Sequence, residues 1–269
     1  MLRISFLTTL LLTNISFAQK TLSGSVVDTN NKPIEYVNIS VLDTKKGTIS
    51  DKEGHYTLDA SALKASDSLL YSHIGHKSKL FALKDVPKEV FLEEEEIAIP
   101  EVVVNAKMPK MKTIKGKGAR FPALVLELID TDLNEETGDF VILKKDHIAK
   151  SFELNVKKNT FDKLILRLVF YKTDTQKEIF EPLIQEPIYV EIPKSKKVQR
   201  VKKDIRVPLP KGIVWIGVEM VEVIGNTDAK LAMGARMTGA WVRAKDNSVE
   251  KIPLGVGIPF SIKGYQSEE

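Results

Sequence analysis

The sequence contains no cysteine in its 269 residues. This absence excludes disulfide bonds, thiolate metal sites and cysteine nucleophiles, so burial of apolar side chains must stabilise the fold. Aromatic residues make up only 7% of the chain, and the longer apolar runs are rich in valine, isoleucine and phenylalanine, which favours β-sheet over helix. No apolar run approaches the ~20 residues that a membrane-spanning helix requires.

The chain also carries little excess charge, since 40 basic and 36 acidic residues give a formal net charge of +4. Such an excess affects binding only where basic residues cluster. They cluster in residues 107–120, which we expect to be an exposed linker, and in residues 194–206, which we expect to form a hairpin with a basic outer face. Six side chains of the second cluster form a candidate patch for anionic ligands, called the basic patch below: Lys194, Lys196, Lys197, Arg200, Lys202 and Lys203.

Two interpretations of the basic patch remain open. In the first, the side chains are solvated and discourage the strand from pairing with another chain. In the second, the patch binds an acidic glycan or makes peripheral contact with an anionic membrane surface. Aromatic residues do not alternate with the basic ones, and we therefore expect no binding of nucleic acid.

The first residues have the pattern of a secretory signal. Arg3 is followed by an apolar run from Ile4 to Leu12, and Ser16-Phe17-Ala18 provides a small-x-small cleavage site. We predict a signal peptide at residues 1–18. The protein is then expected in the periplasm, in association with the outer membrane, or at the cell surface.

The stretch from Thr21 to Tyr56 predicts a compact antiparallel unit. Val37, Ile39 and Val41 alternate with more polar neighbours, which is typical of a strand with one buried face. Tight turns flank this strand, and the second of them contains Gly54 in an Asp-x-x-Gly reversal that we expect to require a positive φ.

Three motifs in this stretch carry a family resemblance: Gly24–Asp28, Pro33–Ile39 and Thr48–Tyr56. Together they resemble the carboxypeptidase-regulatory-like domain, a transthyretin-like β-sandwich. The resemblance covers about residues 21–106, including Val102-Val103-Val104, which looks like the exit from this domain in glycan-importing TonB-dependent outer-membrane receptors. The residues that follow are too few for the barrel of such a receptor.

Residues 121–269 predict further strands separated by proline and glycine turns. In the longest one, Leu166, Leu168 and Phe170 share one face, while Arg167 and Val169 take the other, as a layer of a two-sheet structure requires. We expect an all-β fold in which a transthyretin-like Greek-key sandwich precedes a second, jelly-roll-like β-sandwich of unknown family. We expect the signal peptide at residues 1–18, the first sandwich at 19–95, a linker at 96–120 and the second sandwich at 121–269. Few contacts are expected across the linker.

No linear motif of catalysis is present. No histidine is followed at the third position by glutamate, as a zinc carboxypeptidase requires, and a nucleophile elbow, a P-loop and a dinucleotide fingerprint are all missing. His73 and His76 are interpreted as histidines at the rim of the sandwich. The alternative, a weak two-histidine metal site, requires a bend at Gly75.

Asp130 to Glu136 begins like a calcium loop but has Glu135 where an EF-hand needs glycine. We interpret this segment as a solvated acidic turn. The sequence therefore predicts no catalytic residue, no metal and no cofactor.

The function that fits these features is an exported, non-catalytic accessory or binding protein of the cell envelope, which contacts another envelope protein or a glycan through sandwich surfaces. One alternative is a glycan-active hydrolase in the C-terminal sandwich, because paired carboxylates leave no linear motif. Another is a structural spacer without a sizeable exposed apolar or aromatic patch. A deep cleft that holds two convergent acids would favour the hydrolase.

Overall fold

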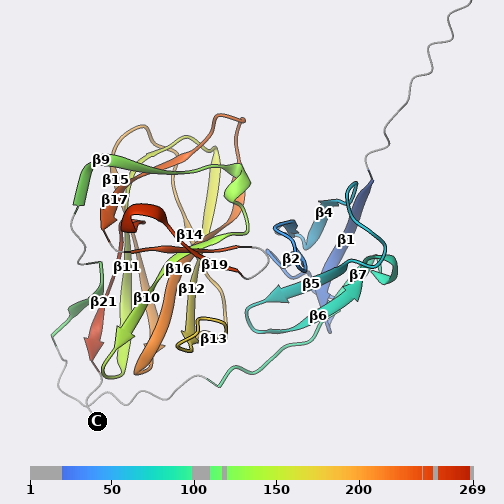
Figure 1. Ribbon diagram of the computed structural model, residues 1–269, viewed down its shortest axis with the longest axis horizontal. Helices are drawn as coiled ribbons and strands as arrows, with labels where there is room; N and C mark the ends of the chain where they lie inside the picture. The colour runs from blue at the N-terminus through green and yellow to red at the C-terminus, as the bar shows by residue number, and fades with distance from the viewer. Residues whose placement is uncertain (1–19, 99–109, 117–119, 238, 245–247, 267–269) are drawn as a thin grey trace, which may run out of the picture.

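The structure is a computed structural model that describes residues 20–98, 110–116, 120–237, 239–244 and 248–266 (Figure 1). It is all-β, as predicted: within these ranges there are strands and three short 3₁₀ turns but no α-helix. None of the described residues lies in a helix long and apolar enough to span a membrane. The predicted signal peptide and Val102-Val103-Val104 lie outside the described residues.

Seven short strands make up the N-terminal half of the fold. They form a three-stranded sheet in the order β4-β1-β7 and a four-stranded sheet in the order β3-β2-β5-β6, which we call the β2 sheet. The strands are β1 (Thr21–Asp28), β2 (Asn38–Val41), β3 (Gly47–Ile49), β4 (His55–Asp59), β5 (Ser68–His73), β6 (His76–Ala82) and β7 (Glu89–Leu92).

These two sheets pack face to face around a shared apolar core. Val37, Ile39 and Val41 are fully buried in this core, which confirms the period-two pattern predicted for this segment. The side chains that alternate with them on β2 point to the opposite face of the β2 sheet, away from the core.

The C-terminal half contains two seven-stranded sheets. In the first, called the β12 sheet, the order is β13-β12-β16-β10-β18-β19, and β14 also pairs with β12. In the second, called the β11 sheet, the order is β20-β17-β11-β21-β8, with β15 paired to β11 and β9 paired to β17. The strands are β8 (Lys112–Lys115), β9 (Arg120–Leu128), β10 (Glu136–Leu143), β11 (His147–Asn159), β12 (Lys163–Thr173), β13 (Phe180–Pro182), β14 (Ile188–Glu191), β15 (Gln199–Leu209), β16 (Gly212–Ile224), β17 (Leu231–Met237), β18 (Trp241–Arg243), β19 (Val249–Lys251), β20 (Val256–Gly257) and β21 (Phe260–Gln266).

The β11 and β12 sheets enclose the largest apolar core of the protein. Leu166, Leu168 and Phe170 of β12 are at most 1% exposed within it, and full burial of each such side chain contributes about 1.5–3 kcal/mol. Arg167 and Val169 lie on the other face, as the alternation predicted. The second sandwich is therefore built in the way that the sequence indicated.

The segment predicted as a linker contains a strand that the sequence analysis did not predict. β8 pairs with β21, with Lys115 opposite Ile262. The Lys115 side chain is buried, forms an ion pair with Asp139, and lies 4.7 Å from the centre of the Phe260 ring. Residues 112–115 thus belong to the β11 sheet, whereas the sequence predicts an exposed linker there.

The N-terminal and C-terminal sheets lie side by side (Figure 1) and share an interface of buried side chains. Tyr36 is 2% exposed and packs with Ile49 against Val221 of β16. Its hydroxyl donates a hydrogen bond to Glu222 at 2.6 Å, and its ring meets that of Tyr189 at a centroid distance of 5.2 Å. The two halves are therefore joined by buried side chains.

Candidate functional site: a polar pocket between the two halves

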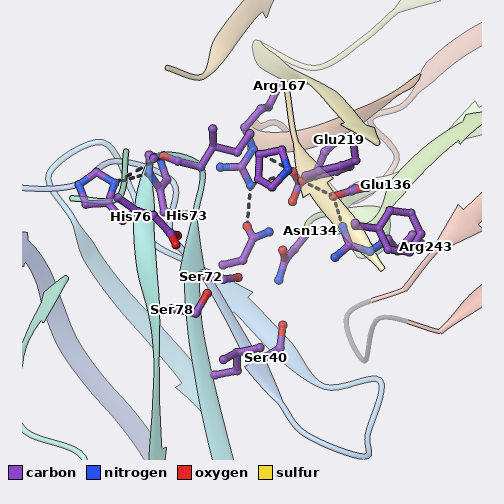
Figure 2. A pocket seen from close by; sticks show the side chains of 18 of the residues that line it. Ser40, Ser72, His73, His76, Ser78, Asn134, Glu136, Arg167, Glu219 and Arg243 are labelled. Carbon is purple, nitrogen blue, oxygen red and sulfur yellow. Dashed lines mark hydrogen bonds and ion pairs between the residues drawn. The ribbon is translucent and has the colours of Figure 1, made fainter. Parts of the chain in front are cut away.

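A cavity of about 240 Å³ lies between the outer face of the β2 sheet and the outer face of the β12 sheet. Figure 2 shows the labelled serines and histidines on one side of this pocket and the labelled arginines and glutamates on the other. The polar side chains that line it are Asn38, Ser40, Ser72, His73, His76, Ser78, Glu95, Asn134, Glu136, Arg167, Tyr171, Glu219 and Arg243.

Small polar side chains form the N-terminal wall because of strand alternation. On β2, Asn38 and Ser40 occupy the positions between the buried aliphatic residues. Their partners on β5 are Ser72 and Leu70, which point to the same face as Asn38 and Ser40. The face of the β2 sheet that does not pack in its own core is therefore rich in hydroxyl and amide groups.

The C-terminal wall is a row of four charged side chains that crosses four adjacent strands of the β12 sheet. Arg167 on β12 is paired in register with Glu219 on β16, Glu219 with Glu136 on β10, and Glu136 with Arg243 on β18. The order of charges along this transverse row is plus, minus, minus, plus. We call it the charged row.

Arg167 connects the charged row to the N-terminal half. Its Nε and Nη2 atoms lie 2.9 and 2.7 Å from Oε2 of Glu219. Its Nη1 donates to the carbonyl oxygen of Tyr36 and its Nη2 to Oδ1 of Asn38, both at 2.8 Å. Burial opposes the charge of this guanidinium, but the carboxylate of Glu219 keeps the pKa of Arg167 above its ordinary value. A buried charge is tolerated when it is paired in this way.

Glu136 is held by three donors. Its Oε1 accepts hydrogen bonds from the Tyr171 hydroxyl at 3.1 Å and from Arg243 at 2.7 Å, and its Oε2 accepts one from the Trp215 indole at 2.9 Å. Burial raises the pKa of Glu136, and the nearby charge of Glu219 adds to this effect, although Arg243 opposes it. The side chain is fixed in place on both oxygens.

Two polar atoms in the pocket wall remain unpaired within the part of the chain that the structure describes: Oε1 of Glu219 and Nε2 of His73. Glu219 is only 1% exposed. Buried polar atoms normally have a hydrogen-bond partner, and leaving one unpaired costs about 1–3 kcal/mol. A ligand hydroxyl or a water that reached either atom would remove this cost.

The two predicted rim histidines face each other across a tight turn. Gly75 in this turn has φ +83°, so the chain bends as the two-histidine alternative required. The Nδ1 atoms of His73 and His76 lie 3.1 Å apart. Burial lowers the pKa of His73 to about 3, and the charge of Arg167 contributes, so the ring is neutral at physiological pH. Among the described residues, no group of three or more histidine, aspartate or glutamate side chains could hold a metal ion.

The basic patch lies elsewhere, on and before β15. All six of its side chains are exposed, and β15 pairs only with β11 among the described strands, so the patch borders a sheet edge. Lys194 pairs with Asp162 at 2.5 Å, and Arg200 lies 3.5 Å from Glu153. The expected hairpin is instead an irregular segment followed by a long edge strand.

The acidic segment at Asp130 to Glu136 divides between two environments. The Asp132 carboxylate accepts a hydrogen bond from the backbone N–H of Ile129 at 2.8 Å in a 3₁₀ turn. Glu136, at the end of the segment, belongs instead to the charged row. The grouping of oxygen ligands that suggested calcium is thus not maintained in space.

Sequence reasoning did not select any member of the charged row as a site residue. The available signal was a charged residue inside an otherwise apolar strand: Arg167 lies between Leu166 and Leu168, and Glu219 between Val218 and Met220. Such charges are rarely buried unless they are paired. The two residues therefore indicated buried charges with partners, but not that they pair with each other.

Solved structures give only distant likenesses. A chain in the structure of infectious bursal disease virus, strain Gx, matches with a TM-score of 0.28 and 10% identity; the match covers 91% of this chain and 62% of the viral chain. A solved structure of carbohydrate-binding modules from the β-sandwich superfamily, which concerns their promiscuous specificity, matches with a TM-score of 0.23 and 10% identity. This match covers 87% of this chain and 96% of that one. Neither likeness is close enough to indicate a function.

A search of curated proteins returned no match. The family comparison concerns the N-terminal half of the fold, which contributes one wall of the pocket. Residues 22–104 match the family model of the CarboxypepD_reg-like domain, which confirms the resemblance that the three sequence motifs carried.

Proposed function

We propose that this protein is an exported, non-catalytic accessory or binding protein of the cell envelope, in the periplasm or associated with the outer membrane, and that it contacts another envelope protein or a glycan. The observation that carries the choice of binding over catalysis is the environment of Glu136. A general acid must share its proton with a leaving group, and a nucleophile needs a free oxygen. Glu136 is poorly suited to either role, because its two oxygens already accept three hydrogen bonds and it would have to give up a donor first.

The arrangement of the pocket also supports binding. Its charged side chains are held by one another and by the backbone of the opposite wall, so little side-chain freedom is lost when a ligand enters. The family match supports the same view, because it concerns a regulatory-like domain.

A second candidate is the glycan-active hydrolase, and one observation favours it. Glu136 and Glu219 are direct partners on neighbouring antiparallel strands, a position that places Cβ atoms ~4.5–5.5 Å apart. Retaining glycosidases hold their two carboxyl groups ~5–5.5 Å apart. For hydrolysis, Glu136 would have to release at least one of its present hydrogen-bond donors and contact the substrate instead.

The experiment that separates the two functions measures binding and turnover together. Purified protein is incubated with polysaccharides and proteins extracted from cell envelopes, and both the bound fraction and newly formed reducing ends are quantified. We expect binding without product. Product formation that Glu219→Gln abolishes would establish the hydrolase, and an absence of both binding and product would leave the structural spacer.

We also propose that the basic patch makes a peripheral contact with an anionic surface of the envelope. Its exposure on an edge strand supports this proposal. The pocket is lined by none of the patch residues, so the two contacts can be tested separately.

A further inference from the structure

We propose that the pocket binds one uncharged, hydroxyl-rich ring, such as a neutral sugar unit at the end of a glycan. This inference rests on the proposed binding function and names the site and the chemical class of its ligand. It follows from the charge balance, the hydrogen-bonding capacity and the size of the pocket.

The charge balance argues against a charged ligand. Each buried arginine of the charged row already has its own carboxylate: Arg167 pairs with Glu219, and Arg243 pairs with Glu136. A ligand with a carboxylate or phosphate group would meet no uncompensated positive charge in this wall. The other carboxylate of the pocket, Glu95, is exposed, so solvent and salt screen its attraction for an ammonium group. A charged ligand would also have to lose its hydration, which is costly for an ion without a partner.

The free hydrogen-bonding groups favour hydroxyls. Oε1 of Glu219 can only accept while the carboxylate is ionised, and it has no partner among the described residues. A hydroxyl group donates to such an atom without bringing a charge. Asn134 donates to Thr48, and Asn38 accepts from Arg167. Among the described residues the Asn134 amide oxygen and the Asn38 amide nitrogen have no partner, so they suit a ligand that both donates and accepts.

His73 adds a group that can either donate or accept a hydrogen bond. Because its pKa is lowered to about 3, the ring is neutral, with one nitrogen that donates and one that accepts. Its Nδ1 faces Nδ1 of His76, so its Nε2 is the atom left for the pocket. A hydroxyl can bind to Nε2 in either tautomer, whereas an ammonium or a carboxylate matches only one.

The size of the pocket limits the ligand to a small unit. A cavity of about 240 Å³ lies below the ~300–1,000 Å³ of pockets that hold drug-sized molecules. Leu70 and Phe180 add apolar surface to the polar walls, which suits a ring with both hydroxyl groups and C–H faces. The remainder of a glycan chain would stay outside.

The test measures affinity by calorimetry for neutral hexoses and short neutral oligosaccharides, and compares them with glucuronate and glucosamine as charged counterparts. We expect neutral sugars to bind at least about tenfold more tightly than either charged sugar. Ser78→Trp places a large side chain at an exposed position of the pocket wall and should abolish binding. Ser23→Trp, at an exposed serine on β1 outside the pocket, is the matched control and should not.

A second variant tests the hydrogen-bonding argument without disturbing the ion pairs. His73→Phe keeps the ring volume but removes Nε2, and we expect it to weaken binding by about two- to tenfold. Preferential binding of a charged sugar, or neutral-sugar affinity that is the same in Ser78→Trp and His73→Phe as in the native protein, would overturn the inference. If no sugar binds while envelope extracts still do, the inference fails and the proposed binding function stands; if neither binds, both fail.

Discussion

Arg167 and Tyr36 lie 131 positions apart in the chain, yet the guanidinium of Arg167 donates a hydrogen bond to the backbone carbonyl of Tyr36 at 2.8 Å. Tyr36 has φ +54°, an uncommon value for a residue with a side chain. Its backbone is thus held in a left-handed conformation at the point where the two halves meet. One arginine therefore forms part of the charged row and, at the same time, anchors the N-terminal half.

We expect Arg167→Met to lower the free energy of unfolding by about 3–5 kcal/mol, because Glu219 would be left as a buried, unpaired charge. Denaturant titration measures this change. The double variant Arg167→Met with Glu219→Met should recover much of the loss, since no charge remains unpaired. Arg200→Ala is the control, because Arg200 is exposed, and it should change stability by less than about 0.5 kcal/mol.

Gly54 is expected to be the least replaceable turn residue of the N-terminal half. Its φ is +78°, as the Asp-x-x-Gly reversal predicted, and a Cβ at this position would lie 2.5 Å from the carbonyl oxygen of Val26. Gly54→Val should therefore lower stability by about 1 kcal/mol or more. Gly212 also has a positive φ but has open space around it. Gly212→Val therefore measures the cost of a positive φ for a residue with a side chain, without a steric clash. Equal melting temperatures for the two variants would show that the contact with Val26 has no effect.

The neutral, buried ring of His73 makes stability depend on pH. Its pKa is about 3 in the folded protein against an ordinary value of 6.5, so between these values the unfolded chain binds a proton that the folded protein does not. Stability is then complete above pH ~6.5 and falls as the pH decreases, by up to ~1.4 kcal/mol per pH unit. We expect His73→Phe to have a smaller slope than the native protein between pH 6.5 and 4.5. Parallel stability curves for the two proteins would contradict this expectation.

The basic patch gives a prediction that does not involve the pocket. Binding to vesicles that contain anionic lipid should weaken as salt increases and should be largely lost in Lys196→Glu/Lys197→Glu/Lys202→Glu. A control with equal loss of charge, Lys84→Glu/Lys88→Glu/Lys46→Glu, should retain binding. If both triple variants lose binding to the same extent, net charge and not the patch is responsible.

The sequence predicted those features that depend on neighbouring residues. The alternation at Val37, Ile39 and Val41, the two faces of β12 and the positive φ of Gly54 each follow from local periodicity or turn chemistry, and each is present in the structure. The three motifs of the N-terminal half were recognisable for the same reason.

The pocket could not be predicted in this way, because it depends on pairing between distant strands. Arg167 and Glu219 are 52 positions apart, and only the register of β12 with β16 makes them partners. The opposite wall comes from the other half of the chain. A charged residue in an apolar strand signals a partner, but strand order decides which residue that partner is.

The strand β8 has a consequence for how the chain can be divided. A fragment that began at residue 121, the predicted start of the second sandwich, would lack Lys112–Lys115 and would leave β21 with an open backbone edge. Asp139 would also lose its buried counterion, Lys115. A recombinant C-terminal fragment should therefore start before residue 112, and the shorter version is expected to aggregate.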